Sequence, residues 1–243
     1  YPQAMAMWCR RHMVKYGTTS EQLGTLAVTF RDNAALNPRA MQRQPISMDD
    51  YLSARPIVDP FRMLDICLES DGACAVLVTS AERAKDLRHT PVYIMSGANG
   101  GGANQGDDLF DCLRWEDHSE NYSAYIADDL WGGAGVGPED VDVAEIYDCF
   151  TYSVVAQLEG LGFCLPGEGP DFIQGGRIAR DGALPLNTHG GLLSEAYIHG
   201  LNHVVEAVDQ LRGDAGPRQI PGAEIALTTA GAMTVGSALV LRN

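Results

Sequence analysis

The stretch Asn187-Thr-His-Gly-Gly-Leu-Leu-Ser194-Glu-Ala-Tyr197-Ile-His199-Gly200 organises the rest of this chain. It places polar and aromatic side chains beside a Gly-Gly pair, immediately before an amphipathic run over residues 201–211. A Gly-Gly pair lets the backbone adopt positive φ and approach a bound group closely. The start of the following helix leaves backbone N–H groups free for a ligand. The pattern therefore indicates either a binding site or a turn that leads into a surface helix.

Composition narrows the class of protein. The chain has 243 residues, of which 45% are hydrophobic and 20% charged, as in a folded globular protein. Its formal net charge of −15 argues against binding to nucleic acid or to anionic membranes. There is no apolar run of about 18 residues, so we expect no membrane insertion. The cysteines lack C-x-x-C spacing. We therefore expect no bound metal and a reducing, cytoplasmic setting.

Periodicity and punctuation predict alternating helices and strands. The predicted helices cover residues 1–16, 20–37, 47–52, 80–87, 121–131, 151–161 and 201–211. In the last of these, Val204, Val205, Val208 and Leu211 are expected to face inward. The predicted strands cover 74–79, 92–96, 143–147, 225–229 and 235–241, with the last two antiparallel and the first buried on both faces. The glycine-rich segment 97–106 is expected to be a mobile loop.

The opening stretch resembles the thiolase superfamily, above all its sterol-carrier-type and lipid-transfer-protein-like members. Their late motif reads Asn-x-x-Gly-Gly-x-x-Ser-x-Gly-His-Pro-x-Gly. The residues of this chain that match it are Asn187, Gly190, Gly191, Ser194 and Gly200. Three positions depart from the motif, because Ala196, Tyr197 and Ile198 stand where it has Gly, His and Pro. The resemblance implies the layered α/β/α/β/α thiolase fold, which alternating elements and a closing hairpin also suit.

Two further segments carry the same resemblance. Residues 16–38 contain Tyr-Gly-Thr-Thr-x-Glu-Gln-Leu and Arg-x-Asn-Ala-x-Leu-Asn-Pro, which are similar to the loop region of sterol-carrier-type thiolases. Asp148-Cys149-Phe150 matches their His-Asp-Cys-Phe segment. The comparison implies that residues 1–90 are the remainder of the N-terminal half with loop-domain helices, and that residues 91–243 are the C-terminal half. It also implies that about 140 residues, with the nucleophilic cysteine, lie upstream.

The departures from the thiolase pattern concern the reactive positions. Tyr197 replaces an acid–base His, Tyr147 stands where thiolases have Asn or His, and residues 230–234 lack the Cys-x-Gly of the last loop. Paired tyrosines at these positions resemble the thiolase-like steroid side-chain aldolases. That family cleaves a 17-hydroxy-steroid acyl-CoA thioester by a retro-aldol reaction to a 17-ketosteroid and propionyl-CoA. The reaction needs one group to deprotonate the hydroxyl and another to protonate the thioester enolate.

The roles can be assigned on this basis. Tyr197 is predicted to be the base and Tyr147 the acid, although the reverse assignment also fits. A free tyrosine has a pKa of about 10, so either the phenol pKa must fall or a relay must carry the proton. His189 and His199 are the nearest relay candidates in sequence, and a motif histidine bonded to backbone is an equal alternative for His189. Gly231, Asn187 and Gly190 are expected to contact the acyl-CoA, with backbone N–H groups near Gly231 stabilising the enolate oxygen.

Other interpretations remain open. His199 and His203 form an i, i+4 pair that lacks a third metal ligand in register, so solvent-facing or packing roles are expected. The chain as a whole fits a catalytically inactive acyl-CoA or lipid-binding subunit, or an acyl-CoA thiolase with altered residues. No cofactor is expected beyond the CoA thioester substrate. The resemblance also implies a homodimer and a small OB-fold, zinc-ribbon partner protein.

Overall fold

A mixed four-stranded sheet lies at the centre of the computed structural model, which describes residues 1–103 and 115–243. Its strands follow the order β3-β6-β5-β4. Both β3 and β5 run antiparallel to β6, whereas β4 runs parallel to β5. The strands are β3 (Tyr93–Gly100), β4 (Val143–Glu145), β5 (Ile225–Gly231) and β6 (Gly236–Arg242). The predicted closing hairpin is therefore confirmed, and the short parallel strand β4 carries the chain into the candidate site.

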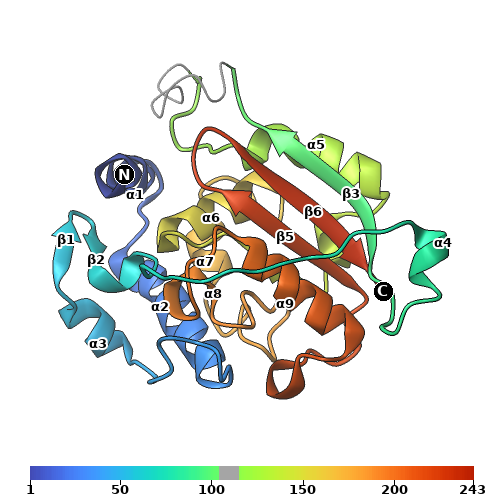
Figure 1. Ribbon diagram of the computed structural model, residues 1–243. Helices are drawn as coiled ribbons and strands as arrows, with labels where there is room; N and C mark the ends of the chain where they lie inside the picture. The colour runs from blue at the N-terminus through green and yellow to red at the C-terminus, as the bar shows by residue number, and fades with distance from the viewer. Residues whose placement is uncertain (104–114) are drawn as a thin grey trace.

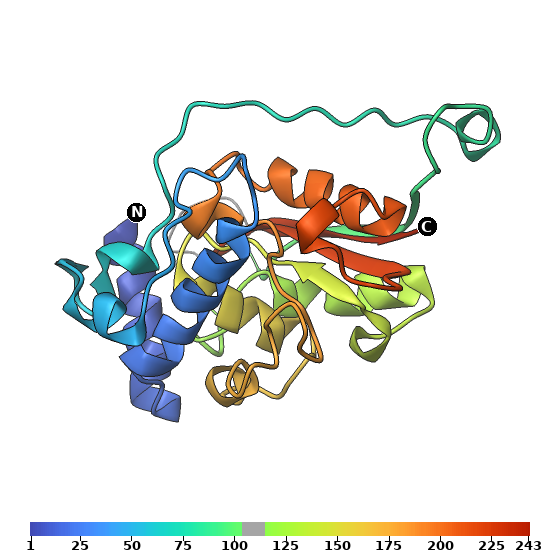
Figure 2. The same ribbon diagram turned by 90° about the horizontal axis from the view of Figure 1, so that it is seen from below.

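Helices cover both faces of this sheet (Figure 1). Helix α9 (Leu201–Arg212) packs on one face, against β4 and β5. Helix α5 (Ser123–Ala134) packs on the other face against β3 and β6, and α6 (Thr151–Gly160) packs against α5. Figure 2 shows α9 and α5 on opposite sides of the strands. The result is a helix–sheet–helix unit, which is part of the layered arrangement expected from the sequence.

The N-terminal helices form a lobe beside the sheet. Their caps follow the sequence, since Gly17 ends α1 at φ 82° and Thr19 forms a capping box with Gln22 at the start of α2. These helices are α1 (Pro2–Tyr16), α2 (Ser20–Ala35) and α3 (Met48–Ser53), followed by the ladder of β1 (Pro56–Val58) and β2 (Phe61–Arg62). The remaining helices are short: α4 (Ala81–Ala84), α7 (Gly169–Phe172), α8 (Gly191–Ser194) and the 3-10 turns Met63–Asp65, Pro138–Asp140 and Gly216–Arg218.

The main hydrophobic core joins the two parts. Leu26 and Phe30 of α2 are fully buried in the same cluster as Val155 and Leu158 of α6 and Leu227 of β5. Helix α8 lies against α2, so the opening motif is held between the lobe and the sheet. In the described ranges, none of the helices combines the length and the apolarity needed to cross a membrane.

Two local predictions were wrong. Residues 74–79 do not form a buried strand, and Leu77 is 87% exposed. Figure 2 shows this stretch as an extended strap that runs along the outside of the molecule towards α4. Apolar residues alone do not make a strand, because a strand also needs a neighbour for its hydrogen bonds. Residues 97–100 of the predicted glycine-rich loop belong to β3, and residues 104–106 lie outside the described ranges.

The inward face of α9 also differs from the prediction. Val204, Val205 and Val208 are only half-buried. The buried residues of this helix are mostly polar: Asn202, His203, Glu206, Ala207, Gln210 and Leu211. A polar face can be buried when every group finds a partner. Helix α9 thus brings a polar side, and not an aliphatic one, towards the candidate site.

Candidate functional site

Tyr147 is held rigidly at the end of β4. Its backbone N–H donates to Thr229 Oγ1 at 2.8 Å. Its carbonyl oxygen accepts from Ser153 Oγ at 2.9 Å and from Gln157 Nε2 at 2.8 Å. These partners come from β5 and α6, which are among the most deeply buried elements of the fold. The main chain of Tyr147 is therefore fixed, and the residue is 5% exposed.

Tyr197 reaches the same place from the loop between α8 and α9. Its backbone N–H donates to Ser70 Oγ at 3.0 Å, and its side chain is half-buried. The hydroxyl oxygens of Tyr147 and Tyr197 lie 2.9 Å apart, with either one as the donor. The rings meet edge to face, with their centroids 6.3 Å apart. The structure thus brings together the two tyrosines that the sequence assigned to one site.

The turn at His199 and Gly200 packs against both rings. Gly200 has φ 82°, and a Cβ at this position would lie 3.0 Å from Tyr147 Cδ2 and 3.2 Å from Ala230 Cβ. His199 has φ 51°, an uncommon value for a residue other than glycine. Its exposed ring lies 4.8 Å from that of Tyr197, centroid to centroid. Two consecutive left-handed residues therefore place one contact on each tyrosine.

Asn187 and Gly190 build the site without facing open space. Asn187 is fully buried at φ 45°, where its Oδ1 accepts from Ile146 N at 2.7 Å and its Nδ2 donates to Ile146 O at 2.9 Å. Gly190 has φ 108°, and a Cβ there would lie 2.5 Å from Ala34 Cβ in α2. Within the chain, both residues have structural roles, and their expected contact with the acyl-CoA stays a prediction. Asn187 positions the residue before Tyr147, and Gly190 allows α8 to pack on α2.

Asp148 fixes the start of α8. Its carboxylate oxygens accept from the backbone N–H groups of Leu192 and Leu193 at 2.8 and 3.2 Å. A carboxylate is favoured at a helix start, where N–H groups lack partners. Gly191 is required here because a Cβ would lie 2.1 Å from Asp148 Oδ2. The residue next to Tyr147 therefore also sets the direction in which the chain departs towards Tyr197.

His189 lies behind the tyrosines and contacts neither of them directly. Its Nδ1 is 2.9 Å from Glu145 Oε2, and its Nε2 is 3.5 Å from Glu195 Oε2. Burial of the ring lowers its pKa, but the charges of Glu195 and Glu145 outweigh burial and raise the pKa of His189 to about 10. The ring of His203 stands between His189 and Tyr147, with centroids 5.0 and 6.3 Å away. His189 is therefore a buried cation, one ring removed from the pair.

A buried polar network continues from the Glu145–His189 pair into α9. Thr188 Oγ1 lies 2.8 Å from a carboxylate oxygen of both Glu145 and Glu206. Arg218 pairs with Glu206 through two bonds, of 3.0 and 2.8 Å. Hydrogen bonds of this geometry satisfy charges that would otherwise be costly to bury. This network explains why α9 carries polar residues on its inward face.

Three side chains in this region lie close enough together to ligate a metal ion. Ligand atoms of Glu145, His189 and His203 all lie within 4.8 Å of one another, and all three side chains are buried. His203 is therefore not solvent-facing, which corrects one of the two roles expected for the 199/203 pair. The raised pKa of His189, about 10, makes its ring a proton-bearing partner of Glu145, and the ring would have to lose a proton before it could bind a metal. We interpret the Glu145–His189 contact as an ion pair.

Gly231 lies at the edge of the site, at the end of β5. It has φ 116°, and a Cβ there would lie 2.5 Å from the Cα of Gly236. The preceding residue, Ala230, would contact a Cβ at Gly200, which itself faces the Tyr147 ring. The end of β5 therefore lies beside the Gly200 turn, which packs against the Tyr147 ring, and the expected contact of Gly231 with the acyl-CoA stays a prediction.

The cysteines in the described ranges are poor nucleophiles. Burial raises the pKa of the Cys67 and Cys164 thiols to about 12, and it raises the pKa of Cys9, Cys74 and Cys149 as well. The thiolate is the reactive form, so each of these five free cysteines is almost wholly unreactive near neutrality. Cys112 lies outside the described residues. Covalent thiolase-type chemistry therefore finds no support among the described cysteines.

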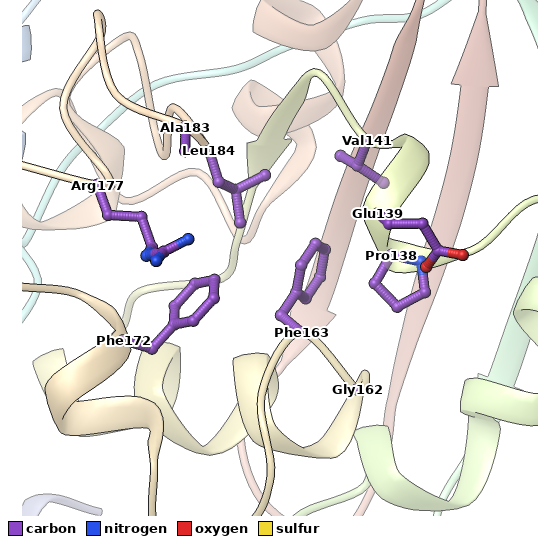
Figure 3. A pocket seen from close by; sticks show the side chains of 9 residues that line it. All are labelled: Pro138, Glu139, Val141, Gly162, Phe163, Phe172, Arg177, Ala183 and Leu184. Atoms are coloured by element: carbon purple, nitrogen blue, oxygen red, sulfur yellow. The ribbon is translucent and has the colours of Figure 1, made fainter.

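A separate depression of about 260 Å³ lies near the end of α6 (Figure 3). Figure 3 shows the rings of Phe163 and Phe172 between Arg177 on one side and Glu139 on the other. The guanidinium carbon of Arg177 is 4.8 Å from the centre of the Phe172 ring. None of the tyrosine-site residues lines this depression, so we do not connect it with the chemistry of the pair.

Sequence reasoning missed several contributors to the site. Ser153, Gln157 and Thr229 fix the main chain of Tyr147, and His203 contacts its ring. All four are polar residues that are fully buried or nearly so. The local signal for His203 was its spacing from Glu206 and Gln210, which places three polar groups on one helical face. The other three are recognisable only once β5, α6 and the β4 loop are placed together.

Comparison with known proteins gives consistent results. Residues 121–243 match the family described as "Thiolase C-terminal domain-like". The chain is 43% identical over 240 residues to the "Steroid side-chain-cleaving aldolase" of Thermomonospora curvata. It is also 43% identical, over 238 residues, to the "17-hydroxy-3-oxo-4-pregnene-20-carboxyl-CoA lyase" of Mycobacterium tuberculosis. In both cases the match covers 98% of this chain and 61% of the relative, so the chain spans about three-fifths of their length.

A solved structure agrees with these relatives. The structure named "Ltp2-ChsH2(DUF35) aldolase" has a TM-score of 0.95 and 42% sequence identity to the chain. The match covers 99% of this chain and 63% of that one. A second structure, the Acat5 thiolase of Ascaris suum in complex with coenzyme A, has a TM-score of 0.65 at 18% identity, which supports the fold alone. That match covers 98% of this chain and 60% of the Ascaris chain.

Proposed function

The chain belongs to the thiolase C-terminal domain-like family, and on that premise we propose that it carries out retro-aldol cleavage of a 17-hydroxy-steroid acyl-CoA thioester. The products would be a 17-ketosteroid and propionyl-CoA, formed during degradation of a sterol side chain. The single observation that carries the proposal is the 2.9 Å contact between the hydroxyls of Tyr147 and Tyr197. The names of two relatives at 43% identity support the same reaction class, that of a carbon–carbon lyase.

The reaction moves one proton from oxygen to carbon. The tertiary hydroxyl lies β to the thioester carbonyl, and loss of its proton starts the reaction. The bond between the carbinol carbon and the α-carbon then breaks, and its electron pair forms the thioester enolate. Protonation of the α-carbon completes the acyl-CoA product. The chemistry thus needs an acceptor and a donor for protons within reach of one substrate, and adjacent hydroxyls supply both functions.

The surroundings of the two phenols favour Tyr197 as the base. Burial and the hydrogen bond with Tyr197 both raise the pKa of Tyr147 far above its ordinary value. Burial also raises the pKa of Tyr197, but the hydrogen bond from Tyr147 opposes this effect. Because Tyr147 is 5% exposed and Tyr197 is only half-buried, burial penalises an ionised Tyr147 more, so we assign Tyr197 as the base and Tyr147 as the donor.

The 2.9 Å contact between the two hydroxyls provides a path for protons even though both phenols have raised pKa values. An isolated phenolate is scarce near neutrality. In one concerted transfer, Tyr197 takes the substrate proton while its own proton passes across the 2.9 Å contact to Tyr147, and Tyr147 gives its proton to the α-carbon, so that both residues remain phenols. The pair then returns to its starting state without net exchange with solvent. We place the enolate oxygen near the backbone of Gly231, where N–H donors would stabilise its charge.

A catalytically inactive acyl-CoA-binding or lipid-binding subunit is the main alternative. An acyl-CoA thiolase with altered residues is the other, and two departures weigh against it: Tyr197 in place of the acid–base His, and the lack of Cys-x-Gly over residues 230–234. A binding subunit would not need the hydroxyls of Tyr147 and Tyr197 to be in hydrogen-bonding contact. We therefore favour the lyase.

The proposal extends to organisation and partners. We infer a homodimer and a heteromeric complex with a small OB-fold, zinc-ribbon protein, supported by the solved structure at TM-score 0.95, whose name includes a second component. We also propose that the N-terminal half of the thiolase fold ends near residue 90, since β3 begins at Tyr93 and pairs with β6 of the later sheet. A CoA thioester substrate is an intracellular metabolite, so we place the protein in the cytoplasm.

The decisive experiment is a product assay. The full-length protein, with and without candidate OB-fold partners, is incubated with a 17-hydroxy-steroid acyl-CoA, and the products are separated by liquid chromatography and mass spectrometry. Equal amounts of a 17-ketosteroid and propionyl-CoA would support the lyase. Tight binding of the thioester without any cleavage, across a panel of β-hydroxyacyl-CoA thioesters, would favour the binding subunit.

A further inference from the structure

His203 occupies an unusual position on the first turn of α9. Its ring is fully buried, and neither ring nitrogen has a hydrogen-bond partner within the described residues. A buried polar atom without a partner is costly, and most native structures contain few of them. An aliphatic residue would fill the same place without that cost. The histidine therefore calls for an explanation beyond packing.

The contacts of His203 point to the tyrosine pair. Its ring meets the Tyr147 ring at 74°, with the centroids 6.3 Å apart. Its Nε2 is 3.4 Å from Asp148 Oδ1. His203 thus contacts two consecutive residues, one of which carries a proposed catalytic hydroxyl and the other of which fixes the start of α8.

Charged side chains surround the His203 ring. On the far side, the His189 ring lies 5.0 Å away and is itself paired with Glu145. Glu195 lies next to His189, and Glu206 follows on α9 with its partner Arg218. The surrounding groups are thus four carboxylates, one guanidinium and one imidazolium. Among them, Nε2 lies 3.4 Å from a carboxylate oxygen of Asp148 without forming a hydrogen bond with it.

We propose that His203 is a positioning residue for the tyrosine pair: its ring holds the Tyr147 ring at the angle where the hydroxyl meets Tyr197, and its Nε2 lies 3.4 Å from Asp148 Oδ1, on the residue next to Tyr147. The consequence for turnover rests on the proposed lyase function. The effect on the position of the Tyr147 ring does not, because it follows from contacts within the chain alone.

Two substitutions separate the nitrogen from the ring. His203→Phe keeps a flat ring and removes both nitrogens, whereas His203→Gln places an amide N–H near the position of Nε2. We expect His203→Phe to lower kcat about 100-fold with KM within about twofold, because a small displacement of a reacting group has effects of this size. His203→Gln should recover at least a tenth of the wild-type kcat. The surface substitution His89→Asn is the control, since His89 is exposed.

A readout independent of activity accompanies the kinetics. The full-length protein is labelled with 3-fluorotyrosine, and the Tyr147 resonance is assigned in the ¹⁹F NMR spectrum by its loss in Tyr147→Phe. His203→Phe should shift or broaden this resonance, and His203→Gln should return it towards the wild-type position. If the wild type shows no cleavage, the lyase proposal fails, and the NMR result still decides whether His203 positions Tyr147.

Three outcomes would overturn the inference. Wild-type turnover and an unchanged Tyr147 resonance in His203→Phe would show that the nitrogens are irrelevant. Equal losses of kcat and of melting temperature in both variants, without recovery by Gln, would leave only a structural role. A stoichiometric metal in elemental analysis of the wild type, lost in His203→Phe, would make His203 a ligand instead.

Discussion

The hydroxyl of Tyr147 lies 2.9 Å from that of Tyr197, although the two residues are 50 positions apart in the chain. Tyr147 is anchored by β5 and α6, and Tyr197 by Ser70 of the segment that precedes the exposed strap. Two independent parts of the structure therefore meet at one hydrogen bond, and changes on either side are expected to alter the chemistry of the pair.

Removal of either hydroxyl should abolish turnover while leaving binding largely intact. Tyr147→Phe and Tyr197→Phe each break the proton path, and general acid–base groups contribute about 10²–10⁴-fold to rate. We expect kcat to fall by at least about 100-fold and KM to change by less than about threefold, measured by steady-state kinetics on the steroid acyl-CoA. Tyr125→Phe is the control, since this exposed tyrosine donates its hydroxyl to Glu120, away from the pair. Full activity in both active-site variants would rule out the paired mechanism.

A methyl group at Gly200 should disturb the pair, and one at Gly213 should not. Both glycines have left-handed φ values, 82° and 79°, so alanine is strained at each and should cost about 1 kcal/mol of stability. Only at Gly200 would the new Cβ press on the Tyr147 ring, because nothing among the described residues lies within 4 Å of a Cβ at Gly213. We expect similar losses in urea denaturation but a lower kcat for Gly200→Ala alone. Equal kcat values would show that the close approach at Gly200 has no catalytic effect.

Asn187 should be needed for stability. Asn187→Ala would leave the backbone N–H and carbonyl of Ile146 without their partners and would place alanine at φ 45°. A buried group that loses its partner costs about 1–3 kcal/mol, so we expect the free energy of unfolding to fall by about 2–4 kcal/mol. Chemical denaturation measures this loss. Asn33→Ala, which removes a buried amide that donates to Leu186 O and Asn187 O, is the comparison and should cost less because the backbone at Asn33 is helical.

The ion pair of His189 predicts a dependence of stability on pH. Its pKa is about 10 in the folded protein, against an ordinary value of 6.5, so the folded state binds the proton more tightly. The stabilisation of the folded state by the protonated His189 is complete below about pH 6.5. It is lost as the pH rises towards about 10, and the free energy of unfolding then falls by at most about 1.4 kcal/mol per pH unit. Denaturation midpoints measured between about pH 6 and 10 should fall accordingly. His189→Gln should flatten this profile, and an unchanged slope would contradict the assignment.

Much of the fold followed from local sequence signals. The helices predicted from residues 20 and 47 onward and the closing hairpin were confirmed, because each depends on residues close together in the chain, such as the capping boxes at Thr19 and Ser47. The strand predicted over residues 74–79 was wrong, because an apolar run says nothing about whether a neighbouring strand is present. The inward face of α9 was also wrong, because the partners of Glu206 lie at Thr188 and Arg218, outside the helix.

The candidate site, too, was predicted only in part from the sequence. Placing Tyr147 and Tyr197 in one site followed from the motif, and the structure brings them into contact. The enclosure of Asn187 and Gly190 did not follow, since it depends on Ile146 and on Ala34 of α2. His189 lies farther from the tyrosines than expected, because the His203 ring stands between them. Residue types can be recognised in a sequence, but the order in which they stack in space is set by distant elements.

The anchoring of the two phenols on separate parts of the structure also limits how such a site can change over generations. Under the proposed mechanism each oxygen works only with its counterpart, so replacing one of them alone would pass through an inactive ancestor. A lineage that moves between this pair and a different acid–base set must therefore alter the segments around Asp148 and Gly200 together.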